Sequence, residues 1–91
     1  MDFEWNERKN EANIAKHGID FDEAIGIFTG FVTERKDIRR DYGETRIIAI
    51  GVMERRELVV VYTMRGEICR IISARRARLN ERRTYRTAQS R

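Results

Sequence analysis

Polar and apolar residues in the first third of the chain follow the pattern of two helices. Asn6 offers a side-chain oxygen that can cap a helix over residues 7–17, and Gly18 ends that helix. Asp20 at the N-cap and Glu23 three residues later form a capping box, which predicts that a second, short helix begins there. Four apolar residues of this second helix recur at helical spacing, and we expect them in the core. They are Phe21, Ala24, Ile25 and Phe28.

The rest of the chain up to residue 74 is rich in β-branched and aliphatic residues, which is typical of strands. The segment Leu58–Tyr62 is apolar on both faces and predicts a central strand. Such a strand needs a cover on both faces, or helices on one face and a partner or the chain's own end on the other. Turns at residues 54–56 and 65–67 and a charged loop with residues 41–44 separate the strands. We expect strands at residues 3–5, 31–34, 45–53, 58–64 and 68–74.

Residues 78–90 suit a terminal helix with a sparse apolar face. The expected order is therefore one strand, two helices, an antiparallel meander and a terminal helix. This order predicts an α+β sandwich in which the helices gather on one side of the sheet. A chain of 91 residues buries one modest core, so we expect residues 1–91 to form a single domain.

The composition is that of a folded cytoplasmic protein. With 41% hydrophobic and 37% charged residues interspersed, the chain has enough apolar material to fold. Cys69 is the single cysteine and lies in an apolar stretch, which indicates a packing role and a reducing compartment. No apolar run approaches the roughly 20 residues that span a bilayer, and the acidic N-terminus does not resemble a signal peptide. We expect a cytoplasmic protein without membrane contacts.

Charge is distributed unevenly along the chain, whose formal net charge is +4. Residues 1–69 carry eleven Lys and Arg against fourteen Asp and Glu, whereas residues 70–91 carry eight Arg against Glu81 alone. A surface that binds a polyanion has this composition. A solvated basic helix, or a tail that pairs with the acidic part of the chain, has it too.

The residue types leave arginine as the group that handles phosphate. One histidine and one cysteine, far apart in sequence, do not provide a metal-ligand set, and we expect no metal or other cofactor. The chain has no pair of histidines, no Gly-rich phosphate loop and no nucleophile elbow. Metal-free RNA cleavage needs an in-line 2′-hydroxyl and stabilisation of the phosphorane charge, which guanidinium groups provide. The candidate cluster is Arg70, Arg75 and Arg76, with Arg46 and Arg65 as contributors from neighbouring strand ends.

Several candidate residues have a structural alternative. A carboxylate of the helices could pair with Arg70 in place of a substrate anion. Histidine is the usual acid–base residue near neutral pH, yet Lys16 and His17 end the first helix, where the helix dipole favours any cation. Tyr85 could stack on a base, and Ser73 could contact RNA or only the backbone where the strand ends.

Short blocks of sequence, in a fixed order through most of the chain, form a combined pattern that is far more specific than any single motif. Near the N-terminus they are FEWNE from residue 3, Lys9, Asn13, KHGI from residue 16, Phe21, Glu23-Ala24 and Phe28. The middle has DYGE from residue 41, Arg46 and Ile50-Gly51, and the last third has VVYT from residue 60, Arg65-Gly66, RIISARRA from residue 70, ERR from residue 81 and Tyr85. In this pattern the chain resembles the BrnT family, the toxins of type II toxin-antitoxin pairs.

The resemblance implies a RelE-like fold and a ribonuclease that halts translation. It also implies neutralisation by a BrnA antitoxin with a ribbon-helix-helix part, through which alone the complex binds operator DNA and represses its own operon. The resemblance is also compatible with a homodimer of the toxin within this complex.

Family and residues together give one leading hypothesis, a metal-independent endoribonuclease acting on RNA. In it Arg70, Arg75 and Arg76 hold the scissile phosphate, and Lys16 or His17 helps proton transfer or charge stabilisation. The expected RNA-binding residues are Arg46, Arg65, Ser73, Arg82, Arg83 and Tyr85. The alternatives are a non-catalytic module whose arginines neutralise phosphates, and an interaction protein whose basic end docks an acidic antitoxin segment.

The chain departs from the family pattern at two helix starts. Asn6 stands where Asp is usual and still caps a helix, whereas Arg78 stands where Thr or Ser often opens the last helix. Losing such a cap costs about 1 kcal/mol. We therefore expect the terminal helix to begin later, with Asn80 as a substitute cap, or to fray.

Overall fold

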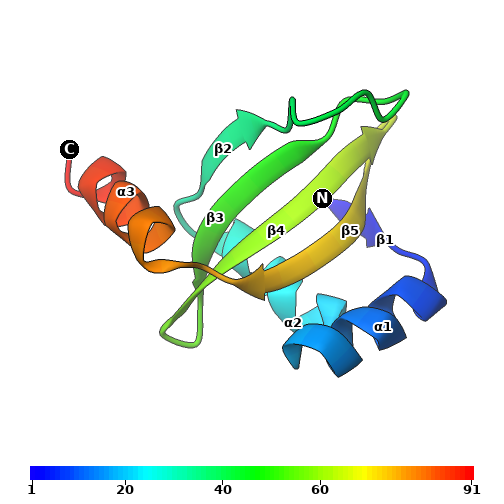
Figure 1. Ribbon diagram of the computed structural model, residues 1–91, viewed down its shortest axis with the longest axis horizontal. Coiled ribbons are helices and arrows are strands. Elements are labelled where there is room, and N and C mark those ends of the chain that lie inside the picture. The colour runs from blue at the N-terminus through cyan, green and yellow to red at the C-terminus, as the bar shows by residue number, and fades with distance from the viewer.

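A computed structural model describes residues 1–91 as one five-stranded sheet with helices on both of its faces (Figure 1). The strand order is β1-β5-β4-β3-β2. The α+β class and the predicted order of strands and helices are confirmed. The elements are β1 (Asp2–Glu4), α1 (Glu7–His17), α2 (Phe21–Ala24), the 3-10 helix η1 (Ile25–Thr29), β2 (Thr33–Lys36), β3 (Ile47–Met53), β4 (Arg56–Arg65), β5 (Ile68–Arg76) and α3 (Leu79–Gln89).

The strands β2 to β5 form the expected antiparallel meander, and β1 adds a parallel edge strand beside β5. In this register Glu4 lies opposite Arg70. The strand β2 begins two residues later than predicted, and β5 continues two residues further. The N-terminal strand therefore makes the sheet mixed, a feature that the meander pattern did not predict.

Helix α1 has the caps that the sequence predicts. The Asn6 side chain accepts a hydrogen bond from Lys9 N at 3.1 Å, and Gly18 adopts the left-handed conformation, with φ of 70°. At α2 the capping box is only half right. Asp20 accepts from Asp22 N at 2.9 Å, but the Glu23 side chain pairs with Arg56 of β4 and not with the N-cap.

The predicted substitute cap of the last helix is wrong. Helix α3 begins at Leu79 with Arg78 at the N-cap, and Asn80 lies inside the first turn. The carboxylate of Glu81 accepts a hydrogen bond from the Arg78 backbone N–H at 2.7 Å. Glu81 thus provides the carboxylate half of a capping box, and the helix begins at Leu79 although Arg78 offers no side-chain acceptor to the first amides of the helix.

The two faces of the sheet bury separate cores. Helices α1 and α2 cover one face, and the predicted core residues Phe21 and Ala24 are fully buried there, with Ile25 and Phe28 packed against them. Cys69 packs in the same core, and burial raises the pKa of its thiol to about 11. The first core contains Ile19, Phe21, Ala24, Ile27, Ala49, Leu58, Val60, Cys69, Ile71 and Ala74.

The opposite face of the sheet is covered in part by the chain's own C-terminal helix. Tyr85 of α3 is buried against Ile48, Ile50 and Val59. The expectation that all helices gather on one side is therefore wrong for α3, which as the chain's own end supplies part of the cover that β4 needs on this face. The helix covers only one end of this face, as Figure 1 shows, and the remainder of the face stays open.

Asn13 of α1 occupies the edge of β5 beyond the end of β1. Its side-chain amide donates to Ala74 O at 2.8 Å and accepts from Ala74 N at 3.1 Å, as a neighbouring strand would. It also donates to Ile19 O at 2.9 Å. This buried side chain fixes the C-terminal end of α1 beside β5.

The turn between β3 and β4 contains two non-glycine residues with positive φ, Glu54 at 51° and Arg55 at 67°. Two-residue hairpin turns of this kind favour Asn-Gly, because a Cβ in the left-handed region costs roughly 1–2 kcal/mol. A glycine at position 55 would therefore give a more stable turn than the arginine that the sequence has there.

Gly51 of β3 is a site where any side chain would overfill the first core. A Cβ there would lie 2.8 Å from Ile27 Cβ and 3.0 Å from Val32 Cγ1. We expect Gly51→Ala to lower the free energy of unfolding by about 1–3 kcal/mol, because the backbone or η1 must move. Urea denaturation measures this, with Gly30→Ala as the control, since a Cβ at Gly30 would meet nothing within 4 Å. Equal stability of the two variants would contradict the packing.

No helix of the structure has the length and apolarity needed to traverse a bilayer. His, Cys, Asp and Glu side chains do not gather in groups of three or more with metal-binding geometry.

Candidate functional site

A cleft of about 620 Å³ lies on the open face of the sheet, opposite the first core. Its floor is apolar and comes from β3 and β4, and its walls are mostly cationic. The C-terminal end of α1, the β2 strand with the following loop, and the start of α3 provide these walls. We call this site the basic cleft; it is lined by Lys16, His17, Arg35, Arg39, Ile48, Val59, Val61, Ser73, Arg75, Arg78, Asn80 and Glu81.

Strand alternation places the floor and one wall of the basic cleft. Ala74 of β5 is buried in the first core, so its neighbours Ser73 and Arg75 point to the other face. In the β4–β5 register Val61 lies opposite Ser73, and Val59 lies opposite Arg75. The polar side chains of β5 therefore stand directly beside an apolar strip.

Arg75 is held in a fixed orientation by Glu81. Its Nη1 and Nη2 atoms donate to the two carboxylate oxygens at 2.8 Å each, in a bidentate pair. The Glu81 side chain is only 14% exposed. The hydrogen bond from Arg75, with that from Arg78 N, lowers the pKa of Glu81 to about 2. Glu81 therefore stays ionised at neutral pH and is too weak a base to accept a proton there.

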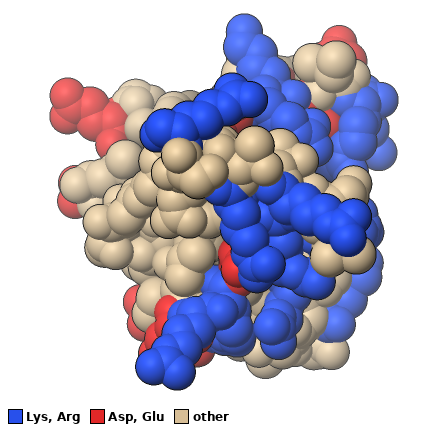
Figure 2. Space-filling view, turned by 90° about the vertical axis from the view of Figure 1, so that its left-hand side faces the viewer, with Lys and Arg blue, Asp and Glu red and all other residues tan.

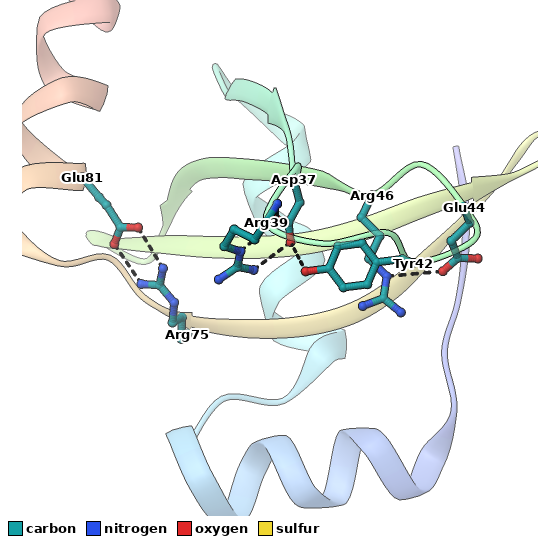
Figure 3. A network of polar contacts seen from close by, with 7 residues as sticks. All are labelled: Asp37, Arg39, Tyr42, Glu44, Arg46, Arg75 and Glu81. Carbon is teal, nitrogen blue, oxygen red and sulfur yellow. Dashed lines mark hydrogen bonds and ion pairs between the residues drawn. The ribbon is translucent and has the colours of Figure 1, made fainter.

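Arg39 is held in the same way by Asp37 in the loop between β2 and β3. Arg39 Nε and Nη2 donate to the carboxylate at 2.8 Å and 2.7 Å, and Tyr42 Oη donates to it at 3.0 Å (Figure 3). The Asp37 side chain is 1% exposed, whereas the Arg39 side chain is 69% exposed. The hydrogen bond from Arg39 holds the pKa of Asp37 far below its usual range. A buried carboxylate thus fixes an exposed guanidinium at the cleft.

Two further guanidinium groups lie over the ring of Tyr42. Arg46 stacks over its ring at 4.1 Å from the centroid, and Arg40 lies at 5.1 Å. Glu44 accepts from Arg46 Nε at 3.4 Å. Figure 3 shows this stack on the side of Arg39 that lies away from Arg75. The loop is therefore tied down by Asp37 and by stacking, although it has no regular secondary structure.

The basic cleft carries more positive than negative charge. Of its cationic side chains, Arg39 and Arg75 are matched by carboxylates, whereas Lys16, Arg35 and Arg78 make no ion pair. Low-dielectric surroundings on the sheet side strengthen the field of these charges. The arrangement suits an extended anion that also has an apolar part.

The structure brings four of the predicted site residues together in the basic cleft, namely Lys16, His17, Ser73 and Arg75. The remaining catalytic candidates lie elsewhere. Arg70 donates to Glu4 of β1 at 2.8 Å, so a carboxylate pairs with it, from β1 and not from the helices. Arg76 faces a different groove, which is described below.

The other predicted RNA-binding residues also lie outside the basic cleft. Arg46 stacks on Tyr42, and Arg65 lies 3.9 Å from Glu44. Tyr85 is buried, and its hydroxyl donates to Phe31 O at 2.8 Å, which is a packing role. The remaining two are on α3, where Arg82 donates to Ala77 O and Arg83 is exposed.

Sequence reasoning missed five polar residues of the basic cleft: Arg35, Arg39, Arg78, Asn80 and Glu81. The pairing of Arg35 with Ile48 places it beside the floor, and this register follows only from the loop length and the strand boundaries. In the sequence Arg78 and Asn80 stand out only as the start of a helix, and Glu81 only as the single acidic residue among residues 70–91. The sequence does contain one signal for the Arg75–Glu81 pair. Glu81 is the single acidic residue among residues 70–91, and it follows Arg75 by six residues.

The Arg75–Glu81 pair predicts a dependence of stability on pH. The folded-state pKa of Glu81, about 2, lies below its usual value of 4.5. The stabilisation is therefore complete above about pH 4.5 and is lost as the pH falls towards 2, by at most ~3 kcal/mol. Urea denaturation between pH 5 and pH 2 measures the loss for the natural chain and for Glu81→Gln. Parallel curves for the two proteins would contradict the prediction, since Asp37 contributes equally to both.

Comparison with known proteins identifies the family of this chain. No curated protein is similar enough to the chain to count as a match. Residues 5–81, which include α1, α2, the strands β2 to β5 and the start of α3, match the family described as ribonuclease toxin, BrnT, of type II toxin-antitoxin system. The chain therefore belongs to the BrnT family of ribonuclease toxins, whose type II systems pair the toxin with a protein antitoxin.

Proposed function

We propose that this toxin is a metal-independent endoribonuclease and that the basic cleft is its active site. The observation that carries the proposal is the convergence of cationic side chains from α1, β2 with its loop, β5 and the start of α3 around one apolar strip. Single-stranded RNA has the matching chemistry, because its phosphates are anionic and its unstacked bases offer an apolar face.

The reaction that suits this site is transesterification by the 2′-hydroxyl. The 2′-oxygen forms a bond to phosphorus, the bond from phosphorus to the 5′-oxygen breaks, and a 2′,3′-cyclic phosphate and a 5′-hydroxyl result. The proton of the 2′-hydroxyl leaves to a base, and the 5′-oxygen receives a proton. The protein supplies orientation of the hydroxyl and stabilisation of the phosphorane charge.

The cleft residues divide between these tasks. Arg75 and Arg39, each fixed by a carboxylate, are rigid donors for the phosphate oxygens. Lys16 and His17 stand at the end of α1 and line the same cleft as Ser73, and we assign them the movement of a proton or the balance of charge. We assign Arg70 no contact with the scissile phosphate, because it does not line the cleft and pairs with Glu4 of β1 elsewhere.

The same proposal covers the cell biology of the toxin. Cleavage of RNA would inhibit translation in the cytoplasm. A BrnA-like antitoxin with a ribbon-helix-helix part would neutralise the toxin and carry the complex to operator DNA.

Cleavage assays on a defined RNA oligonucleotide test the reaction. We expect purified toxin to cleave the RNA in EDTA, and to leave it intact when each nucleotide carries a 2′-O-methyl group. His17→Gln should lower kcat by about 100-fold or more if the histidine moves a proton. Cleavage that requires Mg²⁺, or that survives methylation, would refute the mechanism.

A further inference from the structure

A second groove, of about 250 Å³, lies between the β3–β4 turn and helix α3. Four of its six lining residues are arginines, against one glutamate, and its only apolar residue is an alanine. We call it the α3 groove; it is lined by Arg55, Glu57, Arg76, Ala77, Arg82 and Arg86. Figure 2, which views the molecule from the α3 end, shows Lys and Arg side chains covering much of this side.

The α3 groove is built around Glu57 of β4. Its side chain is 11% exposed, and it accepts hydrogen bonds from Arg86 Nη2 at 2.8 Å and 3.0 Å. Arg82, one helical turn earlier, lies 3.9 Å from the same carboxylate and donates to Ala77 O. One partly buried carboxylate thus aligns two guanidinium groups of α3, and both keep unused N–H donors.

The other two arginines enter the α3 groove from the sheet. Arg76 is the last residue of β5, and Arg55 comes from the turn where both central residues have positive φ. Glycine would adopt the φ of 67° at Arg55 without strain. The strained turn places a cation in the groove.

The α3 groove and the basic cleft lie on the two sides of one short linker. Arg75 and Arg78 line the cleft, whereas Arg76 and Ala77, between them in sequence, line the groove. The linker is held to β4 by the hydrogen bond from Ala77 N to Glu57 O at 2.9 Å. A polyanion that leaves the cleft across this linker enters the groove.

We propose that the α3 groove binds the phosphodiester backbone of the RNA strand outside the scissile nucleotides. This inference rests on the proposed function, because it takes the strand in the basic cleft to be RNA. Guanidinium forks match phosphate oxygens. A folded protein partner would find no aromatic or apolar anchor there, since the core of a protein interface is depleted of charge. An RNA backbone needs no such anchor.

Binding of 2′-O-methyl RNA by fluorescence anisotropy tests this inference without cleavage. Two oligonucleotides are compared, one of five nucleotides that fills the basic cleft and one of fifteen that can also reach the α3 groove. For the natural chain we expect the longer RNA to bind at least 10-fold more tightly and with a steeper salt dependence. Arg55→Gly and Arg86→Gln should each reduce this length advantage about 3- to 10-fold.

Arg55→Gly separates binding from folding, because its two effects have opposite signs. Removal of the strained φ should raise Tm by about 4–8 °C while affinity for the longer RNA falls. The matched control is Arg8→Gln with Arg91→Gln, since both arginines are exposed and line neither site. This control removes more charge than either groove variant and should leave the length advantage unchanged.

Two results would overturn the inference. The control pair could reduce the length advantage as much as the groove variants, which would show a general charge effect. The groove variants could retain the length advantage; if they also lost affinity for the antitoxin, the groove would be assigned to an acidic protein segment. A toxin that binds the longer RNA through the groove but cleaves no RNA would refute the proposed function and leave this inference intact.

Discussion

Replacing Arg75 by alanine is expected to lower kcat/KM for RNA cleavage by about 100- to 1000-fold, the usual effect of losing one preorganised charge-stabilising donor. Arg75 is the arginine of β5 that faces the basic cleft, and its bidentate pair with Glu81 fixes its direction. Single-turnover assays measure the effect, with toxin below saturation for kcat/KM and at saturation for the rate of the chemical step. The loss should be in kcat, because the donor is aligned for charge that develops in the transition state.

Two further variants make this result interpretable. Arg75→Ala leaves the Glu81 carboxylate with only the Arg78 amide as partner, so Arg75→Ala with Glu81→Gln should recover stability but not activity. Arg70→Ala removes an arginine of the same strand that pairs with Glu4 outside the cleft, and should change kcat less than about 5-fold. A larger loss for Arg70→Ala than for Arg75→Ala would move the active site to the β1 edge.

Replacing Asn13 by leucine is expected to lower the free energy of unfolding by about 3–5 kcal/mol. The amide makes three hydrogen bonds to backbone groups of Ala74 and Ile19, and leucine would leave these groups buried and unpaired. A domain of this size has roughly 5–15 kcal/mol of stability in total, so the loss is a large fraction of it. Urea denaturation monitored through the single tryptophan, Trp5, measures the change.

The control for this variant lies on the same helix. Glu11→Ala removes an exposed side chain without hydrogen bonds to the rest of the protein and should change stability by less than about 0.5 kcal/mol. If Asn13→Leu were as stable as Glu11→Ala, α1 would be held to β5 by apolar contacts alone.

The local signals in the sequence were sufficient for most elements of the fold. Asn6, Asp20 and Gly18 marked helix ends because capping depends on the residue and its immediate neighbours. The two-sided apolarity of β4 indicated a central strand that needs cover on both faces. These features depend on short-range chemistry, which a single sequence records.

The predictions that failed concern features that depend on pairing between residues far apart in the sequence. The parallel docking of β1 on β5 joins Glu4 to Arg70, and nothing near either residue specifies that register. The same limit affected the site, since Arg35 and Arg39 reach the cleft only through the β2–β3 pairing and the Asp37 anchor. We expected an arginine-rich functional surface, but charge alone does not say which arginines share a cleft.

The attachment of α3 to the sheet has a consequence for amide hydrogen exchange. Tyr85 is the only buried residue of α3, and the other ties of the helix are polar contacts at Glu57 and Arg75. Amides of β4, buried between two cores, should exchange only on global unfolding, whereas those of α3 should exchange through a local opening of lower free energy. Each such opening removes the α3 wall of the basic cleft while the floor of the cleft stays folded. The exchange rate of the α3 amides therefore measures how often the cleft lacks this wall.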